Sequence, residues 1–131
     1  MSGYVLDELA LVGGLAGAGS EHQRRELSRL LRGAIEGGPA LDIPALCLSA
    51  AAAVRPTIAD HVAEIVVAVP AGTIVVSGLT RTSHLDALMA LVPGLGWPAT
   101  HAAARALTTG LPILTVDADR YVGVRLEVLT L

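Results

Sequence analysis

The chain has 131 residues, the size of one ordinary domain, and 53% of them are hydrophobic while 16% are charged. These proportions exclude an extended disordered chain and provide enough apolar side chains for a buried core. The net charge of −3 argues against a broadly basic surface for nucleic acid. We therefore expect a single domain over residues 1–131.

The sequence is typical of a protein from a reducing compartment. Its one cysteine, Cys47, lies in an apolar run and cannot form an internal disulfide. Asp7 and Glu8 stand where a secretory signal carries positive charge, and the longest apolar run, residues 43–54, is too short for a membrane span. We expect a cytoplasmic protein without membrane contact.

Short apolar strands alternate with helices along the chain. We expect strands at residues 4–6, 73–76, 113–116 and 126–129, with residues 41–43 forming either an edge strand or a link. We expect helices at residues 8–18, 20–35, 45–54, 57–69, 82–92 and 99–109, and a helical turn at residues 119–121. This order predicts an α/β protein whose mainly parallel sheet of four to five short strands is flanked by helices on both faces.

Several of these helix ends carry recognisable turn chemistry. Ser20 and Gln23 have the spacing of a capping box, and Pro44 suits the first turn of the helix that follows it. Thr82 or Ser83 caps the fifth helix, and Gly110 ends the sixth in the left-handed conformation.

The glycines at 13, 14, 17 and 19 invite comparison with a dinucleotide-binding loop. The third glycine of the G-x-G-x-x-G pattern is missing, however, and the first strand ends too far upstream. We favour close packing between helices as the reason for these glycines.

Four arginines lie on one face of the helix at residues 20–35, namely Arg24, Arg25, Arg29 and Arg32. One interpretation is a solvated face on which Glu21 and Glu26 offset Arg25 and Arg29 at helical spacing. The other is a contact with a partner or with an RNA backbone. We favour the solvated face.

Three further residues have both a structural and a functional interpretation. His101 shares a helix face with Arg105, and we favour a polar surface or a subunit contact over a ligand in a pocket. Cys47 has no catalytic base at a recognisable offset and is expected to be a buried small side chain. Trp97 is expected to be a packing anchor, whereas an exposed indole would indicate an interface.

Two acids follow apolar strands directly. Asp7 comes after the first strand and Asp117 after the strand at residues 113–116. In an open α/β sheet, ligands bind outside the carboxyl ends of the strands. We therefore expect Asp7 and Asp117 to lie near each other at that edge.

The order of these elements resembles a PIN domain, the fold of VapC-type toxin ribonucleases. The likeness covers nearly the whole chain and rests on three segments: Val5-Leu6-Asp7, the run 44–48 that leads into a helix, and the block 101–117 from His101-Ala102-Ala103 to Thr115-Val116-Asp117. The resemblance implies a three-layer fold with a central sheet. It also implies a cluster of three or four acids that holds Mg²⁺ or Mn²⁺ for RNA cleavage, because hard cations prefer carboxylate oxygens.

Only part of that acidic cluster is present in this sequence. Asp7 matches the first acid of the family, and Asp117 matches the fourth, with Asp119 as a nearby substitute. The second acid falls on Ala50 and the third on Ala99, so two positions carry methyl groups. We discount Glu8 as a replacement, because adjacent side chains of a strand point to opposite faces.

The resemblance therefore implies a PIN-like domain with a degenerate site and at most weakly bound Mg²⁺ or Mn²⁺. We expect a catalytically weak or inactive binding or regulatory protein related to toxin–antitoxin ribonucleases. The alternative is an active, divergent Mg²⁺-dependent endoribonuclease that uses Asp7, Asp117 and Asp119, with Glu8 as a further candidate. A third class is a structural interaction module without nucleic-acid contact. Expected partners are a second copy in a homodimer, an antitoxin-like protein, or RNA on the four arginines.

Overall fold

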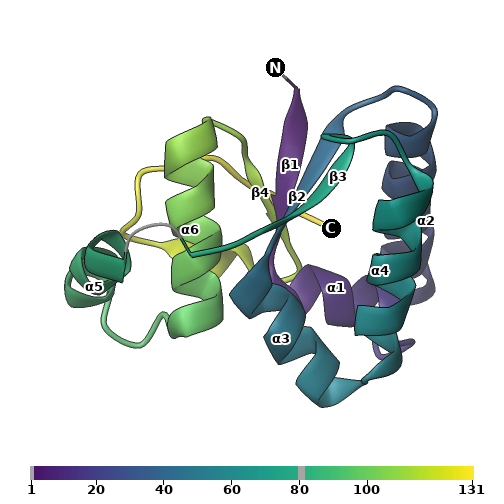
Figure 1. Ribbon diagram of the computed structural model, residues 1–131. Helices are drawn as coiled ribbons and strands as arrows, with labels where there is room; N and C mark the ends of the chain where they lie inside the picture. The colour runs from purple at the N-terminus through teal and green to yellow at the C-terminus, as the bar shows by residue number, and fades with distance from the viewer. Residues whose placement is uncertain (1, 80–81) are drawn as a thin grey trace.

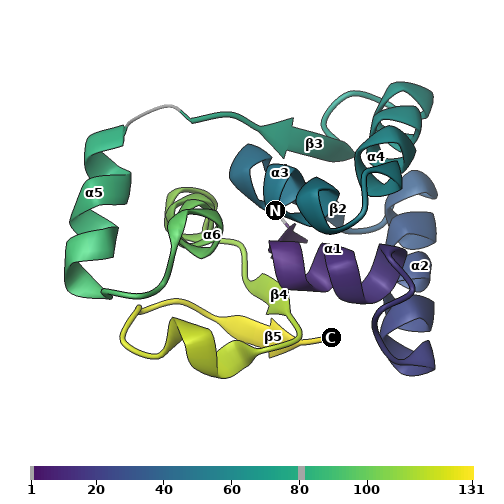
Figure 2. The ribbon, with the colours of Figure 1, turned by 90° about the horizontal axis from the view of Figure 1, so that it is seen from below.

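The computed structural model describes residues 2–79 and 82–131, which form a sheet of five parallel strands between helices (Figures 1 and 2). The strands are β1 (Gly3–Leu6), β2 (Ala40–Pro44), β3 (Ile74–Ser77), β4 (Ile113–Thr115) and β5 (Val128–Thr130). They lie in the order β3-β2-β1-β4-β5, and every neighbouring pair is parallel. The predicted three-layer α/β fold with a mainly parallel sheet is confirmed.

Six α-helices and one 3₁₀ turn connect the strands within the described ranges. They are α1 (Glu8–Leu15), α2 (Glu21–Ile35), α3 (Ala45–Val54), α4 (Thr57–Ala68), α5 (Thr82–Leu91), α6 (Trp97–Thr109) and η1 (Ala118–Tyr121). In Figure 1, α2 and α4 lie on one side of the sheet, and α6 lies on the other with α5 outside it. Among the described helices, none has the length and apolar character needed to cross a membrane.

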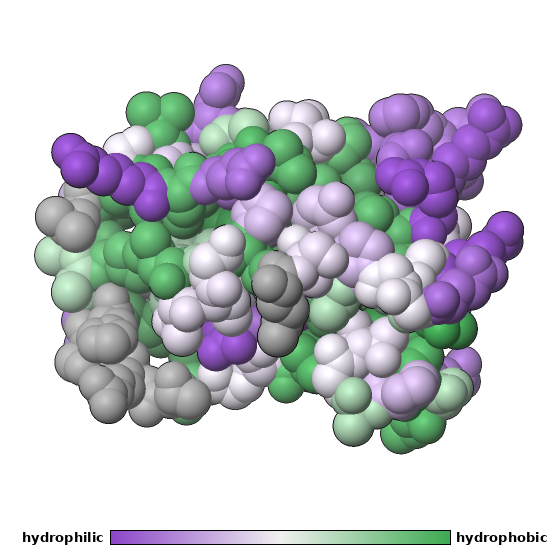
Figure 3. All heavy atoms as spheres, turned by 90° about the horizontal axis from the view of Figure 1, so that it is seen from above, coloured by the Kyte–Doolittle hydropathy of each residue, from purple (hydrophilic) through white to green (hydrophobic). Residues whose placement is uncertain are grey.

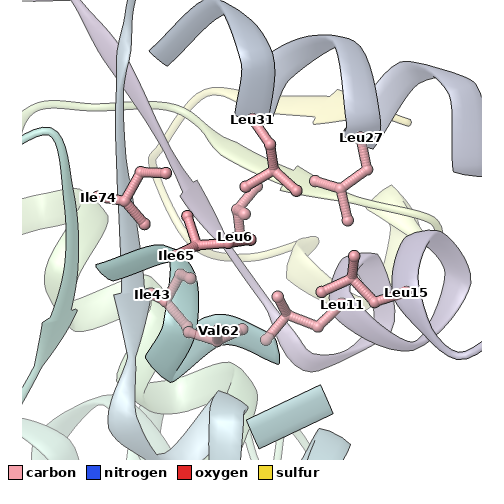
Figure 4. Close-up of a pocket in the computed structure, with 9 residues that line it drawn as sticks. All are labelled: Leu6, Leu11, Leu15, Leu27, Leu31, Ile43, Val62, Ile65 and Ile74. Atoms are coloured by element: carbon pink, nitrogen blue, oxygen red, sulfur yellow. The ribbon is translucent and has the colours of Figure 1, made fainter. Parts of the chain in front are cut away.

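The main core lies between the sheet and the helices α1, α2 and α4. Figure 4 shows nine aliphatic side chains that converge there from the sheet and these three helices, namely Leu6, Leu11, Leu15, Leu27, Leu31, Ile43, Val62, Ile65 and Ile74. They leave a void of about 10 Å³ with no polar lining. A space of that size without polar partners stays dry, so it is a packing gap and not a ligand site.

Most of the predicted local structure is present. The capping box at Ser20 and Gln23 is formed, and Gly110 ends α6 with φ of 74°. The first helix ends at Leu15, three residues before the predicted end, and the last strand begins at Val128, two residues later than predicted. The expected cap at Thr82 or Ser83 falls on two residues of which the structure describes the backbone alone.

The interpretation of residues 41–43 as an edge strand or a link is wrong. This segment belongs to β2, an interior strand that pairs with β1 on one side and β3 on the other. The prediction rested on the shortness of the segment, and β2 extends over Ala40–Pro44. Arg105 on α6 compensates the charge of Asp42 by ion pairing, so the strand can be buried on both faces.

Close helix packing explains the glycines of α1. A Cβ atom on Gly14 would lie 2.2 Å from Cδ2 of Leu27 on α2, so only glycine allows the two helices to approach this closely. The preference for helix packing over a nucleotide loop agrees with this contact.

Two glycine-to-alanine changes should have opposite effects on stability. Gly14→Ala should lower the free energy of unfolding by about 1–3 kcal/mol through overpacking against Leu27. Gly33→Ala, on α2, should raise it by roughly 0.5–1 kcal/mol, because a Cβ there meets nothing within 4 Å and alanine favours the helix. Urea unfolding of both variants measures the difference, and equal effects would contradict the α1–α2 packing described here.

Candidate functional site

The sheet has a topological switch point between β1 and β4. From β1 the chain proceeds to β2 and β3 on one side, whereas β4 and β5 lie on the other. Ligands of open α/β sheets bind outside the carboxyl ends of the strands at such a point. Asp7 directly follows β1, and the segment from Val116 to Tyr121 directly follows β4, so both reach this edge.

Asp7 is fully buried there, and its carboxylate is surrounded by donors. Oδ1 accepts a hydrogen bond from the backbone N–H of Ala10 at 2.9 Å, which makes Asp7 the N-cap of α1. Oδ2 accepts one from the Tyr121 hydroxyl at 2.7 Å and lies 3.4 Å from Nη1 of Arg120. A buried carboxylate is stable only with such partners.

The adjacent Glu8 shares the same guanidinium. Nη1 of Arg120 donates to Oε1 of Glu8, and Nη2 lies 3.5 Å from Oε2. The argument against Glu8 from strand alternation is wrong, because the chain leaves the strand at Asp7 and Glu8 is the first residue of α1. Arg120 therefore bridges two neighbouring acids, and it also stands 5.6 Å from the centre of the Tyr121 ring.

The ionisation of this cluster follows from its burial. Burial, followed by the charge and hydrogen bond of Asp7, raises the pKa of Tyr121 well above its usual value, so the hydroxyl remains a donor. Burial works against the charge on Arg120, but the hydrogen bond and charge of Glu8 outweigh it and raise the pKa of the guanidinium. The cluster holds two acids, one permanent cation and one neutral phenol.

Cys47 lies next to this cluster and is unsuited to nucleophilic chemistry. Burial, reinforced by the negative charges of Glu8 and Asp7, raises the pKa of its thiol far above the usual range. Its Sγ donates to the carbonyl of Pro98 at 3.0 Å, and the residue is fully buried. The expectation of a buried small side chain is confirmed.

The other predicted acids differ from Asp7 in their surroundings. Asp117 and Asp119 are both exposed, and within residues 2–79 and 82–131 neither side chain bonds to Asp7. Ala50 is partly buried on α3, and Ala99 is fully buried on α6. Over the described part of the chain, no three His, Cys, Asp or Glu side chains are grouped so that they could hold a metal.

A second buried acid, Asp42, forms a polar cluster on the α6 side of the sheet. Oδ2 accepts from Nε and Nη2 of Arg105 at 3.0 and 2.9 Å, and Oδ1 accepts from the hydroxyl of Ser77. Our sequence interpretation missed this cluster. The signal in the sequence was Asp42 itself, because an acid in the middle of an apolar strand is stable only beside a cationic or hydrogen-bonding partner.

The interpretation of His101 as a surface or subunit contact is wrong. Its side chain is only 2% exposed, and Nδ1 accepts a hydrogen bond from the backbone N–H of Leu46 at 3.3 Å. That N–H lies in the first turn of α3, whose N-cap, Pro44, provides no side-chain acceptor. His101 therefore caps α3 from another helix.

Trp97 also differs from its predicted role as a packing anchor. Gly96, with φ of 81°, starts α6 directly at Trp97, so the indole lies at the end of the helix and remains 45% exposed. The buried face of α6 begins only at Ala99.

The predicted ion pairs on α2 are formed. Nη2 of Arg25 lies 2.5 Å from Glu21, and Nη2 of Arg29 lies 2.9 Å from Glu26. Arg24 and Arg32 are exposed on the same helix. In Figure 3 hydrophilic side chains project at the right-hand edge, the side on which α2 lies in Figure 1.

No family model and no curated protein matches this sequence. Among solved structures, the chain is similar to the crystal structure of PAE2754 from Pyrobaculum aerophilum. The two share 18% identity at a TM-score of 0.57, and the match covers 98% of this chain and 89% of the other. A likeness at this identity shows the shared fold alone.

Removal of the Tyr121 hydroxyl should reveal how far its hydrogen bond stabilises the buried carboxylate of Asp7. Tyr121→Phe should lower the free energy of unfolding by about 2 kcal/mol, because a buried charged acceptor loses its shortest side-chain bond. Tyr4→Phe is the matched control, since Tyr4 is half-buried and its hydroxyl has no bond within the described residues. Denaturant unfolding of both variants makes the measurement, and equal losses would contradict a specific bond to Asp7.

Acid should destabilise the protein through His101. Burial, followed by Arg105, lowers the pKa of His101 below 6.5, although the Gly78 backbone and Asp42 oppose that shift. Below pH 6.5 the imidazole therefore takes up a proton more readily in the unfolded chain than in the folded chain. The contribution of His101 to the free energy of unfolding is fully present above pH 6.5 and is lost as the pH decreases toward the folded pKa. Protonation of Nδ1 also removes the cap of α3, worth about 1 kcal/mol.

The measurement is urea unfolding from pH 8 to pH 5. The parent protein should lose stability across this range, and His101→Asn, which keeps an acceptor but has no titrating group, should lose less. The exposed His22 and His61 are present in both proteins, so the difference isolates His101. Identical pH profiles would show that His101 does not titrate with folding.

Proposed function

We propose that this chain is a PIN-like domain that acts by binding a partner and not by metal-dependent RNA cleavage. The observation that carries the proposal is the guanidinium of Arg120, which bridges Asp7 and Glu8 at the switch point of the sheet. The family assignment is supported by the order of the three sequence segments that resemble PIN domains.

The side chains at this edge do not fit a divalent cation. Mg²⁺ and Mn²⁺ need free oxygen lone pairs, but the Asp7 oxygens accept from Ala10, Tyr121 and Arg120. Arg120 already supplies the positive charge that a metal would bring, so an incoming cation would meet electrostatic repulsion. The methyl groups of Ala50 and Ala99 leave two family ligand positions without oxygen atoms.

One observation favours the alternative, an active divergent endoribonuclease. Asp117 and Asp119 are exposed at the end of β4 and are free to approach a metal bound to RNA. Such an enzyme would use these two exposed acids together with Asp7, whose carboxylate would exchange Arg120 for the metal.

An RNA cleavage assay separates the two functions. We expect no cleavage of single-stranded RNA above the level of a mock purification when Mg²⁺ or Mn²⁺ is added. Metal-dependent cleavage that disappears in Asp117→Asn and in Asp7→Asn would overturn the binding proposal. Cleavage that persists in both variants would indicate a contaminating nuclease.

A Mn²⁺ titration tests the role of Arg120 directly. The parent protein should show no binding by calorimetry at millimolar metal, and Arg120→Ser should gain weak binding because Asp7 and Glu8 lose their internal cation. Arg120→Lys keeps the charge and should resemble the parent. Thermal unfolding of each variant verifies that it is folded. Equal Mn²⁺ binding in all three proteins would contradict the substitution of a metal by Arg120.

A further inference from the structure

We propose that the exposed face of α2 and the hollow beside β5 together bind a protein segment that combines carboxylates with apolar side chains. This inference rests on the proposed binding function and names the class of partner. We call the two parts the arginine face and the apolar hollow.

The arginine face is a shallow depression of about 500 Å³ on the outside of α2. It is lined by Glu21, Arg24, Arg25, Ser28, Arg29 and Arg32. Two of its arginines pair with Glu21 and Glu26, but exposed pairs of this kind contribute only about 0–1 kcal/mol and exchange partners readily. Arg24 and Arg32 have no ion pair among the described residues, so α2 presents an excess of positive charge on an acidic protein.

The apolar hollow lies between α2 and the end of the sheet and measures about 460 Å³. Its apolar lining comes from Tyr4, Leu30, Leu114, Leu129 and Leu131, and its polar rim from His22, Glu26, Arg29 and Thr130. In Figure 2 the end of β5 points toward α2, and residues of both elements line the hollow. Leu129 is 37% exposed on the edge strand β5, so apolar surface is available there.

The two parts are neighbours, because Arg29 lines both of them. A bound segment can therefore place apolar side chains against Leu129 while its carboxylates face the arginines. Guanidinium groups bind carboxylates through paired hydrogen bonds, which fixes the orientation of such a segment.

Charge and composition select this partner over the other candidates. A second copy would present the same arginine excess, so two arginine faces repel each other. A nucleic acid would meet a protein of net charge −3, and among the described residues the two linings offer only Tyr4 and His22 for stacking a base.

The test is a selection from a random dodecapeptide display library against the immobilised full chain, in EDTA. Selected peptides should be enriched in Asp and Glu together with Leu, Ile, Val or Phe, and their synthetic forms are then measured by fluorescence anisotropy. Peptides without an acidic excess, or no selected binder, would overturn the proposal. The presence of EDTA separates this result from nuclease activity, so each proposal can fail without the other.

Matched variants locate the binding surface. The double variant Arg24→Gln/Arg32→Gln should bind the selected peptide about tenfold more weakly, and the exposed control Arg125→Gln should change binding less than about twofold. Leu129→Thr should weaken binding about threefold, against no change for Val122→Thr, which is exposed outside both linings. If a variant and its control weaken peptide binding equally, the proposed binding surface is wrong. The proposed partner class is wrong if a 12-mer RNA binds the parent protein more tightly than the peptide does.

Discussion

The rest of this structure depends on the burial of one carboxylate, that of Asp7, at the switch point of the sheet. A buried charge persists only where donors surround it, and here they come from both ends of the chain. Ala10 belongs to the first helix, whereas Arg120 and Tyr121 belong to the turn after β4. These bonds join the first strand to the C-terminal part of the protein and fix the edge where a ligand of this fold would bind.

A second buried acid, Asp42, is also paired with an arginine inside the protein. Asp42 in β2 is buried against α6 and pairs with Arg105, whereas Asp7 shares Arg120 with Glu8. Both acids lie where a sheet edge or face could present them to a ligand, and both are instead bonded internally. These two buried acids therefore hold elements of the fold together through internal ion pairs.

This internal pairing gives the molecule two different surfaces. At the carboxyl edge of the sheet, Arg120 and Tyr121 bond to the buried Asp7, whereas α2 exposes arginines held only by weak surface pairs. A partner that carries carboxylates can replace Glu21 and Glu26 in these exposed ion pairs without a metal and with little movement of the backbone. Both proposals thus depend on where the arginines lie. A buried arginine, Arg120, occupies the acids that a metal would need, and the exposed arginines of α2 remain available to a partner.

The sequence by itself determined the local structure, because periodicity and turn chemistry act over a few residues. The capping box at Ser20, the end of α6 at Gly110 and the parallel α/β class all followed from such patterns. Only the tertiary structure decided which charges meet. Arg120 lies 113 residues from Asp7, His101 caps α3 through Leu46, which lies 55 residues earlier, and Arg105 pairs with Asp42 of the interior strand β2 across 63 residues. Pairings at such separations leave no periodic trace, so the chemistry of the site became visible only when the sheet brought those side chains together.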